Sequence, residues 1–226
     1  RFHAGQSWGS SISGDYCGVY LGHYHQCKRL AGLLSKKNSR IANRLKRCRS
    51  LCDNDLTMTI LKILTFPDHT LRQPTNELDN IDGDVQKMID QMSTTMYDAP
   101  GVGLAAIQVG WDKSVLIYDI SASDQERSLQ VLINPRIVDQ EGEILSENEG
   151  CLSVPEFRAD VKRYSSILVE GVDREGRPVE LEAEGMLAIV LQHEIDHLKG
   201  KLFIDHVSAL KRQMYKRRMK KKLRSK

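Results

Sequence analysis

The sequence lacks any apolar stretch long enough to cross a bilayer, and this absence is the first constraint on its class. The longest uninterrupted apolar run covers residues 186–191, six positions, whereas a membrane-spanning helix needs about 20. No charged-then-apolar signal peptide opens the chain, which starts with Arg1. Apolar residues make up 40% of the 226 positions, a share typical of globular proteins. We therefore expect a globular protein with no membrane partner.

Cysteine is scarce outside the first part of the chain. Four of the five cysteines lie within the first 52 residues, and the rest of the chain contains only Cys151. An odd number of cysteines without a secretion signal argues against a disulfide framework and for a reducing compartment. Cys48 and Cys52 are four positions apart, but no second close pair completes a zinc site, so we do not expect one there. Cys151 can be a metal ligand, a nucleophile or a small buried apolar side chain.

Acidic residues are rare at both ends. Residues 1–57 carry ten Lys/Arg and three Asp/Glu. Residues 58–210 carry 13 Lys/Arg and 27 Asp/Glu, and residues 211–226 carry ten Lys/Arg and no Asp/Glu. Basic ends of this kind bind nucleic acid or an acidic surface, or remain solvated.

The charge pattern also divides the chain. Residues 1–57 show no sustained apolar period, so we interpret them as a basic extension that is disordered or loosely helical. Their Arg/Ser-rich composition also suits an organelle transit peptide. Ordered patterning begins at Met58. We therefore expect a catalytic domain over residues 58–208 and a basic C-terminal helix or tail over residues 209–226.

Apolar periodicity predicts an α+β fold. One amphipathic helix is expected over residues 84–97, capped by Asp82 or Asp84, and a largely buried one over residues 185–198. The expected strands cover residues 59–64, 114–120, 131–138, 164–172 and 179–183, and the last two form a hairpin. Strands surround the helices without regular alternation, which predicts antiparallel or mixed sheets around the second helix.

The second helix carries the most specific motif, His193-Glu194-Ile195-Asp196-His197. Residues four apart on a helix share a face, so both imidazoles can reach one metal ion. Glu194 follows the first histidine and can take a proton from water and deliver it to a leaving amine. Two unrelated histidines on a helix would account less well for this match. The motif predicts a metal-dependent hydrolase.

A catalytic metal site with three protein ligands needs one more donor. Cys151 is the candidate, within a segment that reads Glu-Gly-Cys-Leu-Ser-Val-Pro over residues 149–155. Gly150 permits close backbone approach, and Pro155 is expected to stop further strand pairing. A thiolate suits Fe²⁺, Zn²⁺ or Ni²⁺. A nucleophilic cysteine paired with histidine is the alternative, but it leaves the two-histidine helix unexplained.

The third segment, residues 101–108, reads Gly-Val-Gly-Leu-Ala-Ala-Ile-Gln. It matches the glycine spacing of dinucleotide-binding turns, but a helix precedes it and a strand follows, so that context is wrong. An extended Gly-rich segment could instead accept a peptide through main-chain hydrogen bonds. Gln108 would then be an uncharged donor for a carbonyl oxygen. A structural turn with a surface glutamine remains the alternative.

Together and in this order, GVGLAAIQ, EGCLS and HEIDH resemble the three motifs of the peptide deformylases. The resemblance extends over residues 59–208 and includes ILTFPDHTLRQ near its start and HLKGKLFIDH after the second helix. It does not cover residues 1–57. The resemblance implies hydrolysis of the formyl group from the N-terminal formyl-Met of nascent peptides, with release of formate.

The resemblance also implies the metal site. Cys151, His193 and His197 would bind one divalent ion, and Glu194 would be the general acid and base. The usual ion of the family is Fe²⁺, with Zn²⁺, Ni²⁺ or Co²⁺ as substitutes. The second helix then becomes a central metal-binding helix.

Substrate contacts follow from the same resemblance. Gln108 and the backbone N–H of Leu152 would hold the formyl oxygen as it gains negative charge. The residues expected along the peptide and the methionine pocket are Val102, Gly103, Gly150, Ile189 and Val190.

Neighbouring charged residues have less specific roles. Glu149 can orient a ligand histidine. Asp196 can pair with Arg158 or Arg163, and we favour a purely structural ion pair for it.

The basic tail resembles the C-terminal helix of deformylases of the Gram-negative bacterial type, which docks on the ribosome. This implies contacts with rRNA phosphates, and a solvated tail is the alternative. We expect a cytoplasmic monomer, or an organelle protein if residues 1–57 are a transit peptide. Two other functions stay open: a thermolysin-like peptidase, for which only Asp205 or His206 could be the third ligand, and a non-enzymatic ribosome- or RNA-binding protein.

Overall fold

A five-stranded antiparallel sheet is the largest element of the computed structural model, which describes residues 59–122 and 125–224. Its strand order is β1-β2-β3-β6-β7, and all of its pairings are antiparallel. The strands are β1 (Gly103–Ala105), β2 (Val115–Tyr118), β3 (Gln130–Glu141), β6 (Ser166–Val172) and β7 (Pro178–Glu184). Because β1 pairs with β2 alone, it forms one edge of this sheet.

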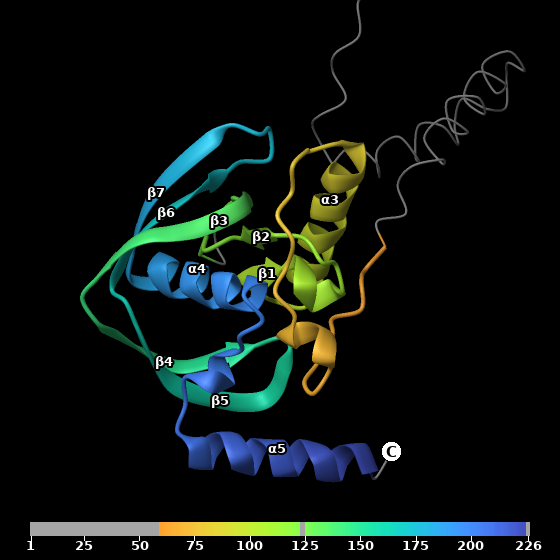
Figure 1. Cartoon of the computed structure of the whole chain (residues 1–226), viewed down its shortest axis with the longest axis vertical. Coiled ribbons are helices and arrows are strands. Elements are labelled where there is room, and N and C mark those ends of the chain that lie inside the picture. Colours follow the sequence, from red (N-terminus) through yellow and green to blue (C-terminus); the bar gives the residue numbers. More distant parts are fainter. Residues whose placement is uncertain (1–58, 123–124, 225–226) are drawn as a thin grey trace, which may run out of the picture. The chain divides into compact units, whose positions relative to one another are not determined.

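Helix α4 (Gly185–Leu198) lies between this sheet and a separate two-stranded hairpin (Figure 1). Its apolar residues, including Leu191 and Ile195, pack in one buried cluster with Leu116 of β2 and Val169 of β6. The helix is mostly apolar, so it can be covered on several sides at once. The expected span of residues 185–198 and the α+β class are both confirmed.

The hairpin consists of β4 (Ile144–Cys151) and β5 (Val154–Arg163), and neither strand was predicted. The expectation that Pro155 stops strand pairing is wrong, because β5 runs through it. The register shifts between the Glu149–Ala159 and Cys151–Val154 pairs. Such a bulge leaves residues without a ladder partner and so tolerates a proline, which has no N–H to donate.

Helix α3 (Gly83–Asp98) confirms the first predicted helix. The Asp82 carboxylate caps it by accepting hydrogen bonds from the backbone N–H groups of Asp84 and Val85. The strand predicted over residues 59–64 is wrong. The Leu61 N–H binds the Thr95 hydroxyl and the Leu64 N–H binds the Gln108 carbonyl, so this segment packs on α3 and the 3₁₀ turn η2 (Ala106–Val109) instead of entering a sheet.

The last element of the described residues is the basic helix α5 (Ala209–Arg224), which follows the 3₁₀ turn η3 (Phe203–Asp205). Tyr215 and Met219 are buried in a cluster with Val154 and with Leu71 of η1 (His69–Arg72). Figure 1 shows α5 on the side of the hairpin away from α4.

The other strand predictions hold within a few residues at their ends. None of the helices in the described ranges combines the length and apolar character that crossing a membrane requires. The interpretations placed on residues 1–57, including the pair Cys48 and Cys52, lie outside the described residues.

Candidate active site

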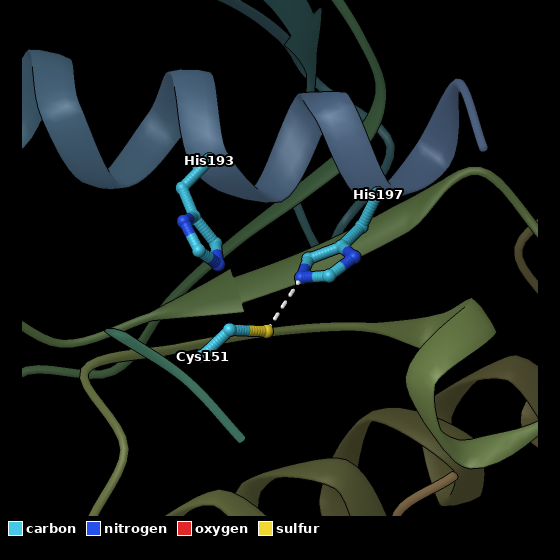
Figure 2. A group of neighbouring side chains, drawn as sticks. All are labelled: Cys151, His193 and His197. Atoms are coloured by element: carbon cyan, nitrogen blue, oxygen red, sulfur yellow. Dashed lines mark hydrogen bonds between the residues drawn. The ribbon is translucent and has the colours of Figure 1, made fainter. Parts of the chain in front are cut away.

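Three potential ligand side chains meet between the hairpin and α4. One donor atom each from Cys151, His193 and His197 lies within 4.8 Å of the others. The Cys151 Sγ is 3.1 Å from the His197 Nε2 (Figure 2). The two imidazoles come from successive turns of α4 and both point toward the cysteine, which ends β4. The i, i+4 spacing therefore puts both rings on the face that meets the hairpin.

A buried carboxylate orients the first histidine. The Glu149 Oε1 lies 2.8 Å from the His193 Nδ1, so the Nε2 of this ring is left for the ligand cluster. Arg163 contacts the same carboxylate through two nitrogens, at 2.7 and 3.2 Å. Burial raises the pKa of Glu149, but the hydrogen bonds and charges of His193 and Arg163 outweigh burial and lower this pKa to about 2.

Asp196 of the HEIDH motif pairs with side chains outside the ligand cluster. Of its two candidate partners, Arg163 is the one that contacts it, at 2.6 Å. Arg158 instead donates to the Asn148 carbonyl. His206 also contacts the Asp196 carboxylate, at 2.9 Å. Burial raises the pKa of Asp196, but the His206 hydrogen bond and the Arg163 charge lower it to about 2.

Glu194 is positioned for proton transfer. It is buried, and its Oε2 has no hydrogen-bond partner among the described residues. Burial raises the pKa of Glu194 to about 7, so the carboxyl can both accept and release a proton near neutrality. A Cβ at Gly103 would lie 2.5 Å from the Glu194 Oε1. Gly103 therefore leaves the space that Glu194 occupies, a constraint that the motif alone did not reveal.

Gln108 directs an N–H group toward Cys151. Its Oε1 accepts a hydrogen bond from the Ala105 N–H at 2.8 Å, which fixes the orientation of the amide. Its Nε2 is 3.1 Å from the Ser153 Oγ and 3.7 Å from the Cys151 Sγ. With 2% of its surface exposed, Gln108 is not a surface side chain on a structural turn.

The turn between β4 and β5 supplies another part of the site. Leu152 lies in this turn directly after Cys151, and the Ser153 N–H is 3.3 Å from the Cys151 Sγ. A Cβ at Gly150 would lie 3.2 Å from the Arg158 guanidinium, so Gly150 allows this side chain to cross the strand. The exposed Arg158 thus lies against Asn148 and Gly150 of β4 instead of Asp196.

The expected peptide-contacting residues surround this region unevenly. Val102, directly before the edge strand β1, is 52% exposed. Ile189 of α4 is half-buried, whereas Val190 is only 5% exposed and belongs to the core cluster around Leu191.

The chemistry of the donor set fits a transition metal. One thiolate and two imidazoles are three protein ligands, and a catalytic site keeps a further position open. His206, the candidate third ligand of a thermolysin-like site, contacts Asp196 and is outside the cluster that gathers Cys151 with the two histidines. An α+β domain with such a cluster beside a buried, proton-accepting glutamate is the framework of a metallohydrolase.

Comparison with known proteins identifies the family of metallohydrolases to which the chain is similar. The family model described as "Polypeptide deformylase" matches residues 60–213. A peptide deformylase of Desulfosudis oleivorans is 52% identical over 167 residues, which cover 74% of this chain and 96% of the relative.

Solved structures show the same fold. A peptide deformylase from Legionella pneumophila matches with a TM-score of 0.68 and 45% identity, covering 74% of this chain and 96% of that one. The Met-Ala-Ser-bound class I type b peptide deformylase from Acinetobacter baumannii matches with a TM-score of 0.64 and 30% identity, covering 67% of this chain and 100% of that one.

The chain belongs to the peptide deformylase family. It is a hydrolase of the metal-dependent kind that removes the N-terminal formyl group from nascent peptides. The predicted family and reaction are therefore confirmed.

Proposed function

We propose that Cys151, His193 and His197 hold a single divalent metal ion at which the formyl group is hydrolysed. The convergence of these three donor atoms within 4.8 Å carries the proposal. Fe²⁺ is the proposed ion, and Zn²⁺, Ni²⁺ or Co²⁺ can take the same ligands. When bound, the metal acts as a Lewis acid that activates water and polarises the formyl oxygen.

Glu194 is the proposed general acid and base. Its raised pKa, caused by burial, suits a group that takes a proton from water and then gives it to the departing amine. Gln108 is the proposed donor to the formyl oxygen as negative charge develops there, and the Leu152 N–H is proposed as a second donor. The anchored amide of Gln108 supports this role, because its orientation costs nothing at the moment of reaction.

The proposed substrate is a peptide that begins with formyl-Met. We propose that its backbone runs along the edge strand β1 at Val102 and Gly103 and opposite Gly150, since an edge strand offers unpaired main-chain groups. Ile189 and Val190 are proposed to border the methionine side chain.

A charge-removing substitution of Glu194 tests the catalytic assignment. Glu194→Gln keeps the shape of the side chain, and we expect kcat on formyl-Met-Ala-Ser to fall by about 10²–10⁴-fold with the metal content unchanged. Purification should be anaerobic to protect a thiolate–Fe²⁺ centre. Glu182→Gln, on the exposed part of β7, is the matched control. Full activity of Glu194→Gln would refute the role of Glu194. If a variant with Ala at Cys151, His193 and His197 still contained bound metal, the proposed ligand set would be wrong.

The outer face of α5 is proposed to bind rRNA phosphates. This helix is docked through Tyr215 and Met219, so deleting it would confuse binding with stability. The variant should instead carry glutamine at four exposed positions: Lys216, Arg217, Lys220 and Lys221. Its control carries glutamine at four exposed lysines elsewhere: Lys62, Lys87, Lys199 and Lys201.

Ribosome pelleting across a series of salt concentrations distinguishes the α5 variant from its control. Each lost phosphate contact should reduce the salt dependence of binding as well as its strength. We expect weaker pelleting and a shallower slope for the α5 variant alone. Equal binding by both variants would favour a solvated tail.

The remaining assignments complete the proposal. We propose the division into a basic extension (1–57), a catalytic domain (58–208) and a basic C-terminal helix (209–226). The proposed state is a cytoplasmic monomer, with an organelle as the alternative location if residues 1–57 direct import.

A further inference from the structure

An exposed histidine outside the ligand cluster is joined to it by an unbroken series of polar contacts. His206 lies between η3 and α5, and 35% of its side chain is exposed. Its Nε2 lies 2.9 Å from the Asp196 Oδ2. None of the roles considered for formyl hydrolysis requires this histidine.

The series continues inward from Asp196. The same Oδ2 accepts a hydrogen bond from Arg163 at 2.6 Å. The other side of the Arg163 guanidinium meets the Glu149 carboxylate at 2.7 and 3.2 Å, and Glu149 lies 2.8 Å from the His193 Nδ1. Arg163 is only 3% exposed, so water does not compete for these bonds. Four side chains thus connect the surface with His193, a proposed metal ligand.

The geometry of the guanidinium makes this connection directional. Arg163 presents its donors in a rigid planar fork, so a change at one edge reorients the other. One edge holds Glu149 and the other holds Asp196, and His206 is the second donor to the same Asp196 oxygen. Since the partner of a ligand histidine sets ring orientation and ligand basicity, the placement of Asp196 reaches His193 through Arg163.

We propose that His206 is a positioning residue of the metal centre, which acts through Asp196, Arg163 and Glu149 on the ring of His193. The inference rests on the proposed metal site. His206 donates a hydrogen bond that holds the Asp196 carboxylate against Arg163, and its place just before α5 ties this support to the C-terminal helix. Its loss should loosen metal retention while the fold stays intact.

Three variants test the proposal in the full-length protein. His206→Leu removes the donor, whereas His206→Gln restores an N–H at a similar reach. His69→Leu is the matched control, because His69, the first residue of η1, is also exposed and also lies near a carboxylate, with its Nδ1 3.7 Å from the Asp68 Oδ1. Each protein is loaded with Zn²⁺, and the rate of zinc loss to excess EDTA is measured beside the Tm of the metal-free form.

The expected pattern is specific to the hydrogen bond. His206→Leu should lose zinc about 3- to 10-fold faster than the parent, less than for a direct ligand partner, with an unchanged metal-free Tm. His206→Gln and His69→Leu should match the parent. Equal rates in all four proteins, or equally fast loss from His206→Leu and His206→Gln, would overturn the proposal. A parent protein that retains no zinc would instead overturn the metal site itself.

Discussion

Strand β5 carries two ion-pair networks, each with one central charge between two partners of opposite charge. The central charge is a buried cation in one network and an exposed anion in the other. At its C-terminal end, Arg163 joins two carboxylates, those of Glu149 and Asp196, and only 3% of its side chain is exposed. Near its N-terminal end, Glu156 joins two cations of α5, Arg218 and Lys222, and 47% of its side chain is exposed.

The surroundings decide what each network contributes. A charge in a water-poor interior pays a large desolvation penalty, so it depends on its partners, and removing one partner leaves the others uncompensated. An exposed pair exchanges its partners for water at little cost. The network at Arg163 should therefore govern stability and the proposed metal site, whereas the network at Glu156 should have little effect beyond adjusting how α5 packs on the hairpin.

The largest expected effect follows from removing Arg163. Arg163→Met removes the cation shared by the buried Glu149 carboxylate and the partly buried Asp196 carboxylate, and we expect the free energy of unfolding to fall by about 3–5 kcal/mol. Urea unfolding of the metal-free protein measures this directly. Arg136→Met is the control, because Arg136 also pairs with one glutamate, Glu77, but is 67% exposed. If both variants lose the same stability, burial does not separate the networks.

Glu149→Gln tests how strongly the network at Arg163 supports the proposed metal site. The amide keeps the volume of the side chain but loses the charge that faces Arg163 and the ring of His193. Losses at partners of ligand histidines reduce metal affinity by about 10–100-fold, and competition with a chelator should show a decrease in this range. Glu147→Gln, two residues earlier on the same strand and exposed, should bind as the parent does. An unchanged affinity in Glu149→Gln would separate this network from the site.

The same comparison explains which parts of the molecule the sequence predicts. Helix α4 was predicted from Gly185 to Leu198, because its apolar run, its motif and its terminal signals agree. The hairpin was not predicted because the buried positions of β4 are polar, Ser146 and Glu149, so this strand lacks the apolar alternation expected of a half-buried strand.

The site also contains parts that local sequence motifs predict and parts that they do not. The three proposed ligands and Glu194 stand in short motifs, so the sequence alone suggests them. The link between Glu149 and Arg163, 14 residues apart, depends on the bulged register of β4 and β5, which no local pattern encodes. The clearance that Gly103 gives to Glu194 likewise joins two segments that are distant in sequence.

Tyr215→Phe examines the docking of α5 without changing charge. The Tyr215 hydroxyl donates to the Pro155 carbonyl at 3.3 Å, while the ring packs against Phe66 and Phe157. Losing one such hydrogen bond should cost about 0.5–1.5 kcal/mol in urea unfolding, less than Arg163→Met. Tyr164→Phe, at a tyrosine that is 41% exposed, should cost nothing measurable. A loss as large as that of Arg163→Met would mean that α5, and not the network at Arg163, dominates stability.

The smallest effect is expected for Glu156→Gln. Glu156 has a positive φ of 59°, and glutamine has the same branching, so the substitution removes charge without changing backbone strain. Because its pairs with Arg218 and Lys222 are exposed, we expect a slight decrease in Tm at low ionic strength. This decrease should vanish in about 1 M NaCl, where the Debye length is about 3 Å. The deficit of Arg163→Met should persist in the same salt, since ions do not reach a buried network. If salt removes the stability losses of both variants, or of neither, then burial does not distinguish the ion pairs of Glu156 from those of Arg163.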